Sequence, residues 1–257
     1  MTINSSDLHH YTTTLPLGMI RVYTNSVNNS KKWSIAPVIS DSARRDLAVF
    51  PPILQQLLYN RGYWFEDAAR AFLNGRVDFD TSPFLLSGMT RAVERILSAR
   101  DHNEQVIIYG DYDVDGVTAT ALLVQTLQAL GVNVTGYIPN RFDEGYGLNN
   151  DALSSLKADG AGLVISVDCG IRSLDEAIHA KNIGLDLIIS DHHQPSDEIP
   201  PAFAVINPKQ IGDHYPDKDL AGVGVAFKIA QALVETCIKN GQEAGLDLGA
   251  LLDLVAL

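Results

Sequence analysis

Three acidic segments of this chain each follow a short apolar run, and their residue types suit a metal centre. In chain order they contain Asp111, Asp113 and Asp115, then Asp168, then Asp191, His192 and His193. Carboxylates and imidazoles crowded at one place repel one another or lose hydration unless a divalent cation lies among them. The sequence therefore predicts a divalent metal site, whose chemistry would be metal-assisted hydrolysis.

The first segment places several carboxylates on one turn. Asp113 and Asp115 are two residues apart, so both can face one point, and Asp111 is a candidate third ligand. Gly116 allows the backbone to turn into the following helix. The alternative is an Asp-rich turn that caps a helix at Val117, because Asp is favoured at helix starts. Three aspartates exceed what a cap needs, so we favour the metal site.

The second and third segments add one carboxylate and two imidazoles. Asp168 follows an apolar run, and by itself it suits a helix cap or turn as readily as a metal ligand. A carboxylate at the end of a central strand can also bridge two ions about 3.5–4 Å apart, as two-metal hydrolysis requires. The adjacent side chains of His192 and His193 point in different directions, so one can bind metal while the other faces the substrate.

From Gln105 onward, short strands alternate with helices. Strands are expected at residues 106–109, 132–138, 163–167, 186–189 and 204–206, and helices at 117–130, 151–158, 173–182, 222–239 and 246–257. This alternation predicts an α/β fold with a parallel β-sheet flanked by helices. Sites in open parallel sheets form beyond the carboxyl ends of the strands, where all three acidic segments fall.

The chain is expected to have three parts. Residues 1–32 show no sustained periodicity and are expected to form a flexible arm. Residues 33–104 carry apolar side chains at helical spacing and predict a small helical subdomain. Residues 105–257 would form the α/β domain.

The composition limits the class of protein. The chain has 257 residues and a net charge of −12, which argues against a broad surface for polyanions but not against a local one. Two cysteines are too few for a disulfide framework, and we do not expect Cys169 to be a nucleophile because another small residue would also fill its turn. No apolar run approaches the ~18 residues of a membrane span and no signal peptide is recognised, so we expect a cytoplasmic protein without membrane association.

The acidic segments stand among other segments that are typical of one family. These are residues 57–73, 138–147, 207–208 and 220–228. From about Trp33 onward the chain resembles the DHH phosphoesterase superfamily and, within it, the RecJ-type single-strand-specific exonucleases. The resemblance implies the N-terminal catalytic part of such an enzyme, with a DHH phosphoesterase domain.

The resemblance also implies roles for the acidic segments. The implied metal ligands are Asp113, Asp115, Asp168 and His192, with Asp111 as a further candidate. His193 would contact the scissile phosphate, and Asp191 would orient its neighbours from outside the ligand shell.

Further along the chain, the resemblance implies phosphate contacts. Arg141 would contact the DNA backbone, because a guanidinium offers paired donors to a phosphate. It could instead form a salt bridge with Asp143 or Glu144. The helix that begins near Gly222 and Gly224 could lend backbone amides to a phosphate, and the glycines could equally permit close packing.

The implied activity is stepwise 5′-to-3′ hydrolysis of single-stranded DNA in repair and recombination, at a two-metal site of Mn²⁺ or Mg²⁺. The histidine ligand favours Mn²⁺. Two alternatives remain at this stage. One is a phosphoesterase acting on short oligonucleotides or small nucleotides, and the other is a non-catalytic module that binds nucleic acid or serves as a scaffold.

The chain departs from the family pattern in two places. Some members have a His at the position of Tyr109, for which Asp111 can substitute. The family also continues, beyond a segment like residues 251–257, into a motif whose Asp completes the metal site and then into a substrate-binding domain. We therefore expect a truncated catalytic part with weak activity, and the sequence leaves its oligomeric state open.

Overall fold

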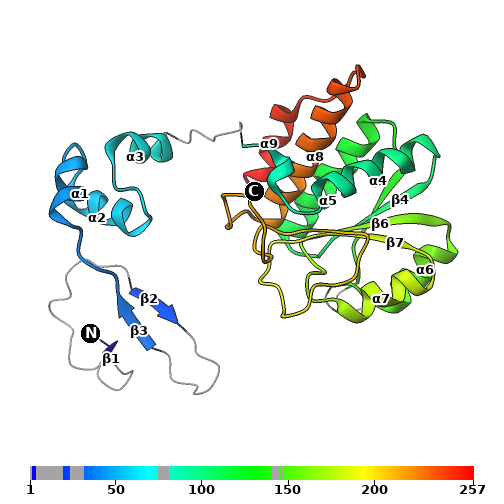
Figure 1. Ribbon diagram of the computed structural model, residues 1–257, viewed down its shortest axis with the longest axis horizontal. Coiled ribbons are helices and arrows are strands. Elements are labelled where there is room, and N and C mark those ends of the chain that lie inside the picture. The colour runs from blue at the N-terminus through cyan, green and yellow to red at the C-terminus, as the bar shows by residue number, and fades with distance from the viewer. Residues whose placement is uncertain (1, 4–19, 24–31, 75–80, 141–144, 146) are drawn as a thin grey trace. The chain divides into compact units, whose positions relative to one another are not determined.

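The chain divides into two units, Met1–Asp80 and Thr81–Leu257, each with its own hydrophobic core. The computed structural model describes residues 2–3, 20–23, 32–74, 81–140, 145 and 147–257 (Figure 1). The division differs from the boundary expected at residue 104. Helix α4, Met89–Asp101, belongs to the second unit because its apolar face, which includes Val93 and Ile96, lies in the core of that unit.

The first unit combines a small antiparallel sheet with three helices. Its strands are β1 (Thr2–Ile3), β2 (Ile20–Tyr23) and β3 (Lys32–Ile35), in the order β1-β3-β2. Its helices are α1 (Asp41–Asp46), α2 (Pro52–Asn60) and α3 (Glu66–Leu73). The flexible arm expected over residues 1–32 therefore includes two short strands among its described residues.

The second unit contains the predicted parallel sheet. Its strands are β4 (Gln105–Tyr109), β5 (Val134–Tyr137), β6 (Ala161–Val167), β7 (Asp186–Ser190) and β8 (Ala204–Ile206). They lie in the order β5-β4-β6-β7-β8, and every neighbouring pair is parallel. The chain moves outward from β4 to β5 on one side and returns to β6 on the other. In open parallel sheets, sites form beyond the carboxyl ends of the strands at such a reversal, which here lies between β4 and β6.

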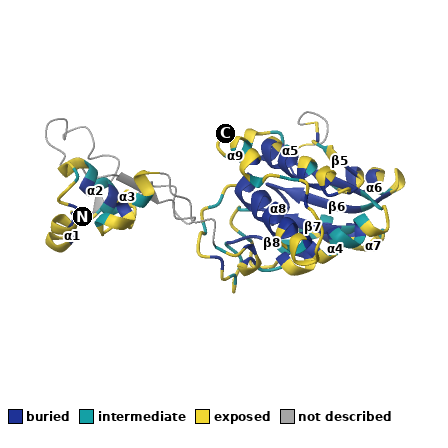
Figure 2. Cartoon of the chain, turned by 90° about the horizontal axis from the view of Figure 1, so that it is seen from above, coloured by how far each residue is buried: buried dark blue, intermediate teal, exposed yellow. Residues whose placement is uncertain are grey.

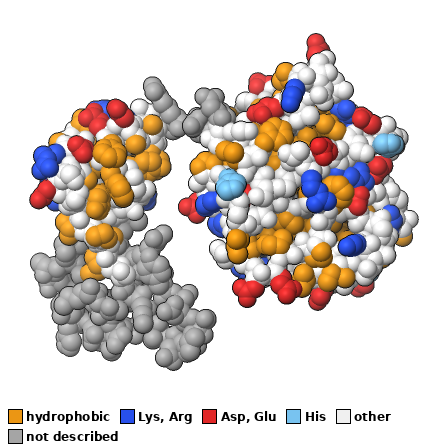
Figure 3. Space-filling view, viewed as in Figure 1, with side chains coloured by type: hydrophobic (Ala, Val, Ile, Leu, Met, Phe, Trp, Pro, Cys, Tyr) orange, Lys and Arg blue, Asp and Glu red, His pale blue; other side chains and the backbone are white. Residues whose placement is uncertain are grey.

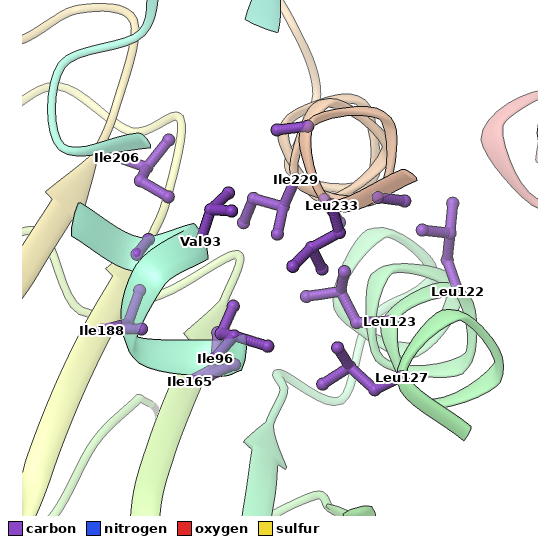
Figure 4. Close-up of a cluster of buried hydrophobic side chains, with 14 of the residues drawn as sticks. Val93, Ile96, Leu122, Leu123, Leu127, Ile165, Ile188, Ile206, Ile229 and Leu233 are labelled. Carbon is purple, nitrogen blue, oxygen red and sulfur yellow. The ribbon is translucent and has the colours of Figure 1, made fainter. Parts of the chain in front are cut away.

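Helices cover both faces of this sheet. They are α4, α5 (Val114–Ala129), α6 (Asn150–Ala158), α7 (Leu174–Asn182) and α8 (Gly222–Lys239). Side chains from α4, α5 and α8 pack on one face, where they meet Ile165, Ile188 and Ile206 (Figure 4). The alternate strand residues, such as Ile107 and Val164, pack with α6 and α7 on the other face. Figure 1 shows the sheet between these two helical layers, and Figure 2 shows that most strand residues are buried.

Two local differences from the predicted elements bear on the site or the chain end. Helix α5 begins at Val114 rather than Val117, because Asp113 already caps it. The segment expected as one helix from residue 246 consists of a 3₁₀ turn, Leu248–Leu251, followed by the short helix α9, Leu252–Val255. Among the described residues, no helix is both long and apolar enough to cross a membrane.

Candidate metal centre

The three acidic segments lie directly after three neighbouring strands. Asp111, Asp113 and Asp115 follow β4, Asp168 follows β6, and the segment Asp191–His193 follows β7. Because the strands are parallel and adjacent, their carboxyl ends lie at one edge of the sheet, beside the reversal in strand order. The expectation that the segments converge at strand ends is confirmed.

The first segment combines a helix cap with a close backbone approach. Asp113 is the N-cap of α5, and its Oδ1 accepts a hydrogen bond from the Gly116 amide at 3.0 Å. The carboxylate of the buried Asp111 accepts from the Tyr112 amide at 2.7 Å. A side chain at Gly116 would place its Cβ 2.6 Å from the Asp111 carbonyl oxygen, so only glycine allows this turn. Asp113 therefore does cap helix α5, as the alternative interpretation expected. Its carboxylate also lies close to those of Asp111 and Asp168.

Asp115 is held by the start of helix α8. Its Oδ2 accepts from the Gly222 amide at 2.7 Å, and its Oδ1 accepts from the Val223 amide at 2.6 Å. The positive end of the helix dipole favours a carboxylate at this place. The Gly222 amide, which belongs to the helix start that the sequence offered for a phosphate, thus donates to a carboxylate of the chain itself. The phosphate contact expected of Gly222 and Gly224 stays a prediction.

Asp168 is the most constrained carboxylate of the centre. Its side chain is 2% exposed and its backbone has φ = 60°, a left-handed conformation that Asp adopts more readily than most residues. Its Oδ1 is buried and makes no hydrogen bond within the described structure, although His192 Nε2 lies 3.1 Å away. Desolvation raises the pKa of Asp168 to about 6, while the His192 imidazole opposes the shift and the carboxylates of Asp115 and Asp113 add to it. A buried oxygen with only an imidazole beside it, among carboxylates, is suited to a cation.

The two histidines have different partners. His192 Nε2 lies 3.1 Å from Asp168 Oδ1 and 3.5 Å from Asp115 Oδ2, and the interaction with Asp168 raises the pKa of this imidazole. His193 Nδ1 lies 2.8 Å from Asp191 Oδ1. Because Nε2 is on the far side of the ring, this contact directs the His193 Nε2 away from Asp191. The two imidazoles thus have different nearest carboxylates, although a ligand atom of each lies within 4.8 Å of Asp168, so the predicted division of their roles stays a prediction.

Asp191 contacts both histidines from a buried position. It is 1% exposed, and its Oδ1 also accepts from the amides of His192 and His193 at 2.7 and 3.0 Å. Its Oδ2 accepts from the Ile171 amide at 2.9 Å. Asp191 is therefore saturated with hydrogen bonds that orient the histidine segment.

The candidate ligand atoms form two groups that share one residue. Within each group the atoms lie within 4.8 Å of one another, and the groups are Asp111, Asp113 and Asp168, and Asp168, His192 and His193. Asp115 belongs to neither group, but it remains 3.5 Å from His192 Nε2. Carboxylates with imidazole suit Mn²⁺ or Mg²⁺. A carboxylate common to both groups has the position of a bridging ligand.

A family model, the DHH family, N-terminal domain, matches residues 105–257. This match covers more than half of the chain. The chain belongs to the DHH family. Its matched region spans the sheet, its covering helices other than α4, and every candidate ligand described above.

Relatives of this DHH-family chain include single-stranded-DNA-specific exonucleases named RecJ. The chain is 49% identical to that of Bacillus subtilis over 183 residues, which cover 71% of the chain and 23% of the relative. It is 38% identical to that of Escherichia coli over 216 residues, or 82% and 37% of the two chains. The matched segments thus span about a quarter to just over a third of these relatives.

Solved structures of RecJ proteins share the fold. A crystal structure of RecJ in complex with Mn²⁺ from Thermus thermophilus matches with a TM-score of 0.63 and 28% identity, covering 84% of this chain and 29% of that one. A structure of exonuclease RecJ bound to manganese matches with a TM-score of 0.58 and 34% identity, covering 66% and 42%. The resemblance noted from sequence motifs is confirmed.

Sequence reasoning missed one residue that supports the centre of this DHH-family chain. Asn207 follows β8 and is fully buried, and its Nδ2 donates to the His193 carbonyl oxygen at 2.9 Å. Its Oδ1 accepts from the Lys209 amide at 2.8 Å. The pair Asn207-Pro208 was visible as a motif directly after a strand, and that position was the signal for a role at the site.

The other sequence-based candidates have simpler outcomes. Arg141 lies outside the described residues, so its predicted DNA contact stays a prediction.

Burial raises the pKa of the Cys169 thiol well above its usual value, which disfavours a nucleophilic thiolate. Tyr109 is buried in the core under α6 and its hydroxyl donates to the Gly147 carbonyl oxygen at 3.0 Å.

Proposed function

We propose that this chain is the N-terminal catalytic part of a metal-dependent exonuclease that hydrolyses phosphodiester bonds of single-stranded DNA. The observation that carries the proposal is Asp168, a buried carboxylate shared by two groups of ligand atoms at the carboxyl ends of a parallel sheet. The DHH family assignment and the names of the RecJ relatives support the reaction and the substrate.

The ligand set suits divalent ions such as Mn²⁺ or Mg²⁺, and Asp168 would belong to both groups of residues that hold them. Asp111 and Asp113 would hold one ion together with Asp168, and His192 would hold the other. Such ions activate water and neutralise the charge that develops on the phosphate. The structures of RecJ in complex with Mn²⁺ and with Mg²⁺ support the choice of ions.

Side chains of this chain would orient the substrate beside the ions. Asp191 engages Nδ1 of the partly exposed His193 ring, which would leave Nε2 available to contact the scissile phosphate. Asp115 stays beside His192 because the amides of Gly222 and Val223 hold it there. On the face shown in Figure 3, basic side chains of the second unit are interspersed with acidic and hydrophobic ones. This mixture fits a local phosphate contact at the metal centre better than a broad basic surface.

Calorimetric titration with Mn²⁺ and digestion of labelled single-stranded DNA test the proposal. The wild type should bind Mn²⁺ and release nucleotides in its presence, while Asp168→Asn should lose both properties. The exposed Asp159→Asn, outside the centre, is the matched control and should retain both. Equal Mn²⁺ binding by the wild type and Asp168→Asn would contradict the bridging role. Comparing 5′-labelled with 3′-labelled strands reports the direction of digestion, and dinucleotides as preferred substrates would favour a small-nucleotide phosphoesterase.

A further inference from the structure

Helix α8 begins against two of the carboxylates of the metal centre. The Gly222 amide donates to Asp115, and the Cα of the same glycine faces Asp168. A Cβ added at Gly222 would lie 2.7 Å from the Asp168 Cβ, 2.7 Å from its Oδ1 and 2.9 Å from its Cγ. Carbon atoms in van der Waals contact are about 3.5–4.0 Å apart, so no side chain fits here without movement.

Neither side of this contact is free to move away. Asp168 is 2% exposed, its amide donates to the Ser190 carbonyl oxygen at 3.0 Å, and its φ of 60° restricts its backbone. On the other side, the first turn of α8 is buried in the sheet-facing core. A shift of this turn would also break the two short hydrogen bonds that hold Asp115.

We propose that Gly222 is a positioning residue of the metal centre. Its lack of a side chain lets one helix end hold Asp115 through backbone amides while Asp168 keeps its carboxylate among both groups of ligand atoms. Two ligands that are 53 positions apart in the sequence thereby receive their relative placement from a third segment. This inference rests on the proposed metal-binding function and identifies the part of the chain that orients its ligands.

Gly224, two residues further along the same helix, provides a matched control. The three atoms nearest to a Cβ added there all belong to the Leu220 side chain, the nearest at 3.4 Å, which is ordinary van der Waals contact. Both glycines lie in the first turn of α8, and both are buried. An alanine at either position makes the same chemical change in the same helix, but only the one at 222 meets Asp168.

The first experiment measures Mn²⁺ affinity by calorimetry and by electron paramagnetic resonance. Gly222→Ala should weaken Mn²⁺ binding by about 10–100-fold, as displacement of supporting residues does at other metal sites. It should also change the Mn²⁺ spectrum, which a loss of global stability alone would not do. Gly224→Ala should bind as the wild type does. Absence of Mn²⁺ binding by the wild type would count against the proposed function, whereas equal binding by the wild type and Gly222→Ala overturns this inference.

A double-mutant cycle in the metal-free protein tests the contact directly. Glycine at position 168 suits its φ of 60° and removes all three atoms nearest to the added Cβ. Gly222→Ala should lower the Tm by about 5 °C or more in the wild-type background, since overpacking is destabilising. In the Asp168→Gly background it should leave the Tm unchanged or slightly raised. The double variant should therefore fold even if Gly222→Ala alone does not, and equal Tm losses in both backgrounds overturn the inference.

Discussion

His193 Nδ1 lies 2.8 Å from Oδ1 of Asp191, a carboxylate that is 1% exposed and also receives three backbone amides. The ring of His193 is therefore oriented by a residue that is not itself in either group of ligand atoms. Orientation of this kind matters for chemistry, because residues that support an active side chain are worth about 10–100-fold in affinity or activity.

Asp191→Asn should reduce the rate of DNA hydrolysis by about 10–100-fold while the protein stays folded. The substitution places an NH₂ group either against the Ile171 amide or against the amides of His192 and His193, so at least one hydrogen bond is lost in either orientation. Single-turnover digestion with saturating Mn²⁺ measures the effect. Since both residues act through one imidazole, adding Asp191→Asn to His193→Ala should cause no further loss. Additive losses would show that Asp191 acts independently of His193.

The adjacent histidines offer a matched pair of substitutions. His192→Ala should weaken Mn²⁺ binding severely, because its Nε2 lies 3.1 Å from Asp168 Oδ1. His193→Ala should spare most Mn²⁺ affinity and severely reduce hydrolysis, because its Nδ1 is engaged by Asp191, which leaves only Nε2 for the substrate. Calorimetry and the DNA digestion assay on the same preparations separate the two effects. An equal loss of Mn²⁺ affinity in both variants would make His193 a ligand, as its place in the second group of ligand atoms allows.

Asp168→Asn should stabilise the metal-free protein at pH 7.5. Burial raises the folded-state pKa of Asp168 from 3.8 to about 6, so the folded state favours the protonated form. A shift of about two units corresponds to at most about 3 kcal/mol in the free energy of unfolding. Asparagine also tolerates the φ of 60° at this position, whereas alanine would add backbone strain. Thermal unfolding in chelator should therefore give a higher Tm for the variant.

The raised pKa of Asp168 also determines whether the stability of the metal-free protein rises or falls with pH. Between about pH 4 and pH 6 the folded state binds more protons at Asp168 than the unfolded state does, so the stability of the metal-free protein falls as the pH rises. The raised pKa of His192 acts in the same direction. The difference in Tm between Asp168→Asn and the wild type should therefore shrink as the pH is lowered from 7.5 to 4.5. A difference that does not change with pH would mean that desolvation of this carboxylate is not its origin.

Much of this fold and site follows from local patterns. From Gln105 onward, short apolar strands alternate with helices, and each acidic segment directly follows an apolar run. Parallel strands then bring those segments to one edge whatever the details of packing. The convergence of Asp168 with His192 could therefore be predicted without the structure.

Other features depend on contacts between distant segments and were not predictable. Asp115 receives two amides from residues that are 107 and 108 positions away, so no local pattern distinguishes it from Asp113. The left-handed backbone of Asp168 is set by its neighbours in space, because its sequence equally suits an ordinary turn. Helix α4 was expected in the N-terminal subdomain because helical spacing shows that a face is apolar but not which core it joins.

Asn207→Ala should impair hydrolysis although this residue holds no ligand position. Its carboxamide joins the segment after β8 to the segment after β7 by donating to the His193 carbonyl oxygen at 2.9 Å. Leaving that acceptor unsatisfied in a buried place should cost about 1–3 kcal/mol of stability, and it should loosen the histidine segment. The expected result is a lower Tm with a reduced rate of hydrolysis and a smaller change in Mn²⁺ affinity. The exposed Asn133→Ala is the control, and a lower Tm with an unchanged rate per folded molecule would confine Asn207 to a structural role.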